Sequence, residues 1–134
     1  MASPSHVMSE ARPPTPRQRA GARAEQAALD HLLQHGLRLL ARNHHCRQGE
    51  VDLILRSGET VVFVEVRYRR RSDFLHPAES VDRRKQRRII HAARHYLATH
   101  PPLAGLNIRF DVIAATGDPA RPDLEWYQNA FDAF

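Results

Sequence analysis

The sequence predicts an α/β domain in which helices flank a mixed β-sheet. Apolar residues recur at helical spacing over residues 18–34 and 79–100, and they follow strand patterns in the segments between and after these helices. Gly36 and the Pro101-Pro102 pair are the expected ends of the two helices. The predicted element order is therefore α-β-β-β-α-β-β.

Short segments rich in turn residues separate the expected strands. Arg56–Glu59 is expected to close a hairpin, residues 69–77 to form an arginine-rich loop, and residues 117–122 to form a turn. If the third and fourth strands run parallel, the second helix joins them as a right-handed crossover. The strands are expected over residues 37–43, 50–55, 60–68, 107–115 and 124–128.

Length and composition indicate one folded domain over residues 18–134, because 134 residues with 42% hydrophobic side chains suffice for a single core. Residues 1–17 hold four of the nine prolines and no apolar periodicity, which predicts a disordered arm. No apolar run reaches about 18 residues and no secretory apolar region is visible, so no membrane contact is expected. Since Cys46 is the only cysteine, we expect a cytoplasmic location.

The net charge of +5 comes almost entirely from arginine, since Lys85 is the only lysine. Arginine matches phosphate oxygens with paired hydrogen bonds, so this charge favours a polyanionic partner such as nucleic acid. A genome whose base composition favours arginine codons would produce the same bias. The arginines expected to bind the phosphates of a nucleic-acid backbone are Arg69, Arg70, Arg71, Arg84, Arg87 and Arg88.

The predicted hairpin places its acidic residues on one face. A symmetric turn centred on Ser57-Gly58 pairs Leu55 with Thr60. The same register pairs Glu50 with Glu65. One face is then wholly apolar and is expected to pack on a core: Val51, Leu53, Leu55, Val62, Val64 and Val66. The polar members of the other face gather at the end away from the turn. That face carries Glu50, Asp52, Ile54, Val61, Phe63, Glu65 and Arg67.

Three carboxylates on this second face lie within reach of one divalent cation. Cross-strand neighbours are ~5 Å apart and diagonal ones ~7 Å, so Glu50, Asp52 and Glu65 are candidate ligands. Their mutual repulsion requires a cation or protons, and hard oxygen ligands suit Mg²⁺ or Mn²⁺. The alternative is an ordinary solvated sheet face on which Glu65 pairs with an arginine.

Each predicted helix carries one charged residue inside its apolar stripe. Glu25 interrupts the stripe of the first helix, and Lys85 interrupts that of the second. Each alone is explained by a helix end or by a long side chain that reaches solvent. Burial of an unpaired charge is costly, so each of these residues needs a partner or a metal nearby. Because both are expected beside the acidic strand face, we expect them to share one cleft with it.

Several motifs together resemble the YraN family of bacterial proteins. The resemblance covers about residues 18–131 and keeps the order and spacing of the elements. It rests on Gly21-x-x-Ala24-Glu25, Gly49-Glu50-Val51-Asp52-Leu53, Val62-Phe63-Val64-Glu65-Val66-Arg67, Lys85, Arg109-Phe110-Asp111-Val112 and Asn129-Ala130-Phe131.

That family resembles the restriction-endonuclease-like superfamily and its archaeal Holliday-junction resolvases, which implies a metal-dependent phosphodiesterase core. The resemblance assigns the helix glutamate to Glu25 and the two strand acids to Asp52 and Glu65. It places the usual lysine at Arg67, and a basic residue of the following helix at Lys85. An arginine stays protonated, so Arg67 can stabilise phosphate charge and cannot act as a general base.

These observations favour a Mg²⁺-dependent endonuclease that hydrolyses phosphodiester bonds in structured DNA. Asp52 and Glu65 would hold the cation, with Glu50 or Glu25 completing its ligand shell. One alternative is a nucleic-acid-binding module that keeps this fold without the chemistry. Another is a protein-interaction adaptor whose basic surface is compositional. A homodimer is compatible with each of these functions.

Overall fold

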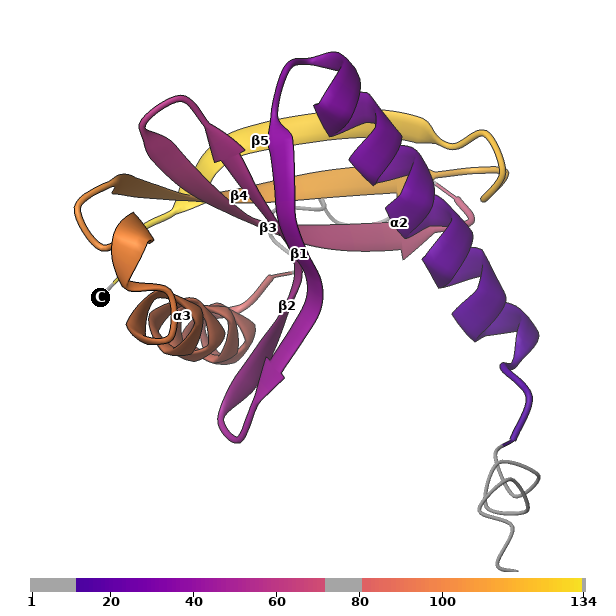
Figure 1. Ribbon diagram of the computed structural model, residues 1–134. Helices are drawn as coiled ribbons and strands as arrows, with labels where there is room; N and C mark the ends of the chain where they lie inside the picture. The colour runs from indigo at the N-terminus through magenta and orange to yellow at the C-terminus, as the bar shows by residue number, and fades with distance from the viewer. Residues whose placement is uncertain (1–11, 72–80, 134) are drawn as a thin grey trace, which may run out of the picture.

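The computed structural model describes residues 12–71 and 81–133, which form a five-stranded sheet with two α-helices (Figure 1). The element order confirms the predicted α/β class and the order α-β-β-β-α-β-β. The elements are α2 (Pro16–Gln34), β1 (Arg38–Cys46), β2 (Gly49–Ser57), β3 (Thr60–Arg69), α3 (Arg83–Ala98), the 3₁₀ turn η2 (Pro101–Leu103), β4 (Asn107–Thr116) and β5 (Asp123–Phe131).

The first helix begins two residues earlier than the sequence suggested. The Thr15 side chain accepts a hydrogen bond from the Gln18 backbone N–H, and the Gln18 side chain accepts one from the Thr15 N–H. This reciprocal capping box fixes the helix start, and Pro16 suits the first turn. Pro16 and Arg17 therefore belong to α2, whereas residues 1–11 of the predicted arm lie outside the described residues.

The second helix begins later than predicted. The Asp82 carboxylate accepts a hydrogen bond from the Lys85 backbone N–H at 2.8 Å, so Asp82 caps a helix that starts at Arg83. Arg69, which was expected to begin a loop, is the last residue of β3. Residues 72–80 lie outside the described residues, and most of the predicted loop falls there.

The strands lie side by side in chain order, β1-β2-β3-β4-β5. β3 and β4 run parallel, from the pair Thr60–Asn107 to the pair Arg69–Thr116, while the other three pairings are antiparallel. The connection between the two parallel strands contains α3 and η2. The third and fourth strands therefore run parallel, which is the condition under which the second helix was expected to join them.

Each face of the sheet packs against one helix, so the sheet is the middle layer of three (Figure 1). The core under α2 contains Ala28, Leu29, Leu32, Leu37, Leu53, Leu55, Val62, Val64 and Ile113. The core under α3 contains Val51, Ile54, Val61, Phe63, Val81, Ile89, Ile90, Ala92, Ala93, Tyr96, Phe110 and Val112. Both predicted helical stripes are therefore confirmed as core-facing. Neither described helix combines the length and apolar composition that a membrane span requires.

The hairpin register differs by two residues from the prediction. Ser57 pairs with Thr60, and Leu55 pairs with Val62 instead of Thr60. The turn is the two-residue type, with Gly58 at its first central position and a φ of +57°, which glycine adopts without strain. A shift of two residues preserves the facing of each side chain, so the predicted faces survive the wrong register in the part where β2 and β3 are paired.

The shift changes which acidic residues are neighbours. β2 and β3 stay paired as far as Leu53 and Val64. Beyond that pair the β2 backbone separates from β3, and the backbone N–H of Val66 donates to the Asp52 carboxylate at 2.8 Å. Asp52 therefore lies next to β3 where Glu50 was expected.

Val51 departs from the predicted apolar face. It packs in the core under α3, while Leu53 packs in the core under α2. Strict alternation would place both side chains on one face. The alternation is broken around Asp52, at the place where the two strands separate.

Asp111 is a structural residue of β4. Its fully buried carboxylate accepts two hydrogen bonds from Arg109, one from the Trp126 indole and one from the Asn129 backbone N–H, all at 2.9 Å. Asn129 has a φ of +53°, and the register between β4 and β5 shifts between Phe110 and Val112. The Asp111 carboxylate thus holds an irregular part of β5 against β4.

Gly49 lets the end of β2 approach the α3 backbone. A Cβ atom at this buried position would lie 1.8 Å from the Arg88 carbonyl oxygen. Real Cβ contacts are never this short, and the opposing atom is backbone that cannot rotate away. The absence of a side chain at Gly49 is what allows β2 to bend toward α3.

We expect Gly49→Ala to lower the free energy of unfolding by about 1–3 kcal/mol or more, because the added methyl group must push β2 away from α3. Gly105→Ala is the matched control, since a Cβ at Gly105 meets nothing within 4 Å. Urea denaturation measures both. Equal stability of the two variants would contradict the close approach.

Candidate active site

The predicted acidic residues gather where β2 separates from β3. Asp52 reaches across the separation, held by the Val66 N–H. Burial raises the pKa of Glu65, and the charge of the facing Asp52 side chain raises it further. Lys85 of α3 completes this group with a Nζ–Oε2 distance of 3.4 Å to Glu65. The structure therefore brings together one acidic residue of β2, one of β3 and the single lysine.

Glu65 is buried, with 4% of its side chain exposed. Its Oε2 atom contacts Lys85 Nζ and, at 3.5 Å, Arg67 Nη1. Its Oε1 atom is buried and has no hydrogen-bond partner. Burial, and after it the charge of Asp52, raises the pKa of Glu65 to about 8. The two cations only partly offset the cost of charging this group.

Glu25 lies on the other side of Asp52, on α2. Its Oε1 accepts hydrogen bonds from the side chains of Arg42 and Asn43, each at 3.2 Å. Burial raises the pKa of Glu25, and the charge of Asp52 adds to the increase. Glu25 and Asp52 line a pocket of about 260 Å³ together with Arg17, Gly21, Val66, Tyr68 and Arg69.

Glu50 is engaged elsewhere. Its carboxylate contacts Arg88 Nη2 at 3.3 Å and Lys85 Nζ at 3.5 Å, both from α3, and His45 Nδ1 at 3.9 Å. The hydrogen bond from Arg88 is the main reason that the pKa of Glu50 is lowered. In residues 12–71 and 81–133, no three Asp, Glu, His or Cys side chains are close enough together to hold a metal ion. The expected trio of Glu50, Asp52 and Glu65 is not assembled, because the register shift moves Glu50 toward the α3 cations.

Asp52 and Glu65 by themselves fit a divalent cation. They are carboxylates from adjacent strands, and one Glu65 oxygen is buried without a partner. Mg²⁺ is held in many enzymes by one or two carboxylates, with water or substrate oxygens as its other ligands. A cation between these acids would offset their repulsion and satisfy the orphaned oxygen. Glu65 and Lys85 do not line the pocket of Glu25 and Asp52, so this pocket holds two of the four side chains that were expected in one cleft.

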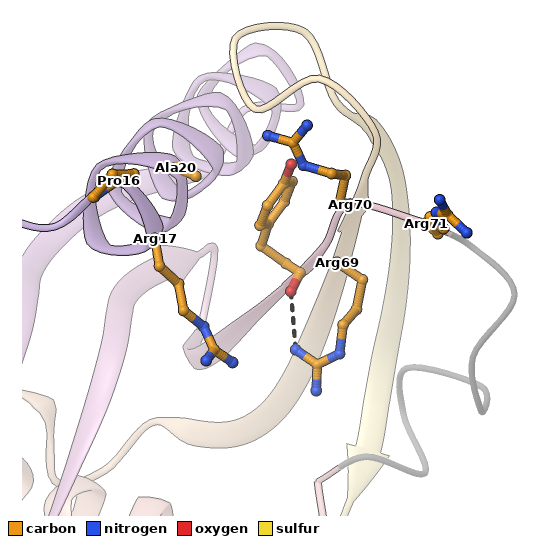
Figure 2. Close-up of a pocket in the computed structure, with 7 residues that line it drawn as sticks. Pro16, Arg17, Ala20, Arg69, Arg70 and Arg71 are labelled. Atoms are coloured by element: carbon orange, nitrogen blue, oxygen red, sulfur yellow. Dashed lines mark hydrogen bonds between the residues drawn. The ribbon is translucent and has the colours of Figure 1, made fainter.

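The arginines expected to bind nucleic acid fall into two groups. Arg69, Arg70 and Arg71 line a hollow of about 520 Å³ beside the N-terminal turn of α2 (Figure 2). Arg84 and Arg87 are exposed on α3. On the same helix, Arg88 is tied to Glu50. The first group adjoins the acidic pocket, since the hollow and the pocket share three lining residues: Arg17, Tyr68 and Arg69.

Arg17 and Tyr68 were absent from the sequence-based site. Arg17 precedes Gly21 and Glu25 at intervals of four residues, so it extends the stripe already noted on α2. Arg17 was expected to lie in the N-terminal arm, because the helix was expected to start at residue 18. Tyr68 follows Val66 by two residues and so shares its strand face. Continuation of both patterns by one step would have placed Arg17 beside Gly21 and Tyr68 beside Val66.

We expect Glu65→Gln to stabilise the protein in EDTA, increasingly so as the pH rises. The pKa of Glu65 is raised from 4.5 to about 8 beside Asp52, Arg67 and Lys85, so the folded state binds a proton that the unfolded state loses. Stability from Glu65 is full below about pH 4.5 and is lost as the pH rises to about 8. Glutamine does not titrate, and Lys85 keeps its contact with Glu50.

Thermal unfolding between pH 5 and 9 measures this difference, with the exposed turn variant Glu59→Gln as control. A tenfold change in an acid dissociation constant corresponds to about 1.4 kcal/mol. The unfolding free energy that Glu65→Gln gains at pH 8 is therefore on the order of a few kcal/mol. A Glu65→Gln variant whose unfolding free energy tracks that of the wild type across this range would contradict the buried, proton-binding carboxyl.

Comparison with known proteins identifies the family. The model of the uncharacterised protein family UPF0102 matches residues 24–115. A UPF0102 protein of Xanthomonas campestris pv. campestris (strain B100) is 52% identical over 118 residues, which cover 88% of this chain and 95% of the relative. UPF0102 proteins of Chromohalobacter salexigens and Stutzerimonas stutzeri (strain A1501) are each 50% identical over 116 residues, which cover 87% of this chain. The match covers 93% of the Chromohalobacter protein and 97% of the Stutzerimonas protein. The chain therefore belongs to the UPF0102 family, the YraN family that its motifs resemble.

Proposed function

We propose that the protein is a Mg²⁺- or Mn²⁺-dependent endonuclease that hydrolyses phosphodiester bonds in structured DNA. The observation that carries this proposal is the orphaned Oε1 atom of Glu65 beside Asp52. Buried carboxyls with a raised pKa beside a second carboxylate are typical of functional sites. The adjoining arginine-lined hollow supplies positive charge where a polyanionic substrate would approach.

Each residue of the proposed site has a separate role. Asp52 and Glu65 would hold the cation, which when bound would lower the pKa of a water molecule and neutralise charge on the scissile phosphate. Lys85 and Arg67, both against Glu65, balance the negative charge around that phosphate. Glu25, held by Arg42 and Asn43, faces Asp52 across the pocket and orients water there. Arg67 keeps its proton, so it binds phosphate and takes no part as a base.

A second function is favoured by a specific feature of the same group. The ion pairs of Glu65 with Arg67 and Lys85 supply part of the charge compensation that a metal would provide. A nucleic-acid-binding module that keeps the fold without chemistry would use the same arginines and leave Glu65 in these pairs. Cleavage measurements distinguish the two functions, because only the nuclease responds to the divalent cation.

We expect the wild type to cut branched or single-stranded DNA with Mg²⁺ or Mn²⁺, and Asp52→Asn to be slower by about 100-fold or more, because it loses a metal-binding charge. Asp123→Asn is the matched control, an exposed aspartate of β5 that lines neither the hollow nor the acidic pocket. Gel analysis of labelled DNA with and without EDTA measures the rates. The alternative outcome is that the logarithm of the wild-type affinity for DNA falls linearly with the logarithm of the salt concentration, while no cation supports cleavage of any substrate. That outcome would contradict the nuclease and favour the nucleic-acid-binding module.

We expect Arg67→Lys to increase metal-dependent cleavage. A lysine beside Glu65 can lose its proton when its pKa is lowered by burial, and its compact ammonium leaves room for water beside the cation. The same DNA assay, run with Arg56→Lys as control on a neighbouring strand, measures the effect. Slower cleavage by Arg67→Lys would show that the arginine acts as a phosphate clamp and that water activation depends on the metal alone.

A further inference from the structure

We propose that the hollow between α2 and the end of β3 binds one unpaired nucleotide of the DNA strand that is cut. The proposal rests on the proposed nuclease function and deepens it by naming the class of substrate. The substrate is DNA with an unpaired nucleotide beside the scissile phosphate, such as a flap, a frayed junction or a single-stranded end.

The size and lining of the hollow fit a nucleotide better than a bare phosphate. Its volume of about 520 Å³ lies within the range of about 300–1,000 Å³ that is typical of small-molecule sites. Pro16, Ala20 and the Tyr68 ring supply apolar surface, whereas arginine side chains supply charge. An apolar surface with a cationic rim matches a base joined to a phosphate.

The arginines around the hollow have charge available for a ligand. Over the described ranges, no carboxylate forms an ion pair with Arg17, Arg69, Arg70 or Arg71. Arg69 Nη1 donates to the Tyr68 carbonyl at 2.9 Å, which holds this guanidinium in place and leaves its other nitrogens available. Figure 2 shows Arg17 from α2 and Arg69 from β3 extending into the same space, while Arg71 points away from the helix.

Side chains, and not the helix end, provide the affinity for phosphate. The Thr15–Gln18 capping box already uses backbone N–H groups at the start of α2. The Tyr68 hydroxyl donates to the Gly117 carbonyl, which fixes the ring at the edge of the hollow. A fixed aromatic ring costs little entropy when a base stacks on it, and such stacking is tolerant of sequence.

The hollow continues into the acidic pocket, because Arg17, Tyr68 and Arg69 line both. A strand whose phosphate lies near Asp52 would therefore place a neighbouring nucleotide between α2 and β3. A base that remains paired carries its partner strand with it and does not enter a space between two elements of the fold. This geometry points to an unpaired base at that step of the strand.

The test compares a blunt duplex with the same duplex carrying a single-stranded flap, by fluorescence anisotropy in EDTA so that no cleavage occurs. We expect the wild type to bind the flapped duplex about tenfold more tightly. Tyr68→Leu should lose this preference, whereas Tyr68→Phe, which keeps the ring, should retain most of it. Arg17→Gln should bind several-fold more weakly and lower the salt slope by ~0.7, the value for one contact to a single strand.

Arg23→Gln is the matched control, an exposed arginine of α2 that does not line the hollow. It should keep the wild-type preference. Equal affinity for both duplexes, or equal behaviour of Arg17→Gln and Arg23→Gln, would overturn the nucleotide site. Cation-dependent cleavage of blunt duplexes that Asp52→Asn abolishes would then leave the nuclease standing without it. No DNA binding at low salt would overturn both.

Discussion

The hydrogen bond from the Val66 N–H to the Asp52 carboxylate sets the architecture of the site. At this point β2 and β3 stop pairing, and a side chain replaces the ladder partner that the Val66 N–H would otherwise have had. The separation lets the end of β2 turn toward α3, where Gly49 meets the Arg88 backbone. It also places Asp52 between Glu25 of one layer and Glu65 of the sheet. The fold and the candidate site thus depend on the same bond.

The charges around this bond are arranged at a cost to stability. Burial and neighbouring carboxylates raise the pKa of both Glu25 and Glu65, while Lys85 and Arg67 offset only part of the penalty at Glu65. An apolar residue at position 65 would pack without that cost, as the rest of β3 does from Val61 to Val64. Groups that are held in an unfavourable state by a structure are typical of functional sites.

Patterns with a fixed period were read correctly from the sequence, whereas features set by contacts between elements were not. The faces of the hairpin followed from alternation, which a shift of two residues leaves unchanged. The register itself depended on a two-residue turn at Gly58. The face on which the Val51 side chain lies depended on the break in pairing near Asp52. Glu50 matched every local criterion for a ligand, yet cations from α3 attract it, and no local pattern reveals their position.

The most direct test of this account is a crystal structure of the protein grown with Mn²⁺, whose anomalous scattering locates the ion without ambiguity. We expect one peak between the carboxylates of Asp52 and Glu65, which disappears in Asp52→Asn. No peak at this position, with the Glu65 carboxylate still paired to Lys85 and Arg67 in the presence of the cation, would contradict it.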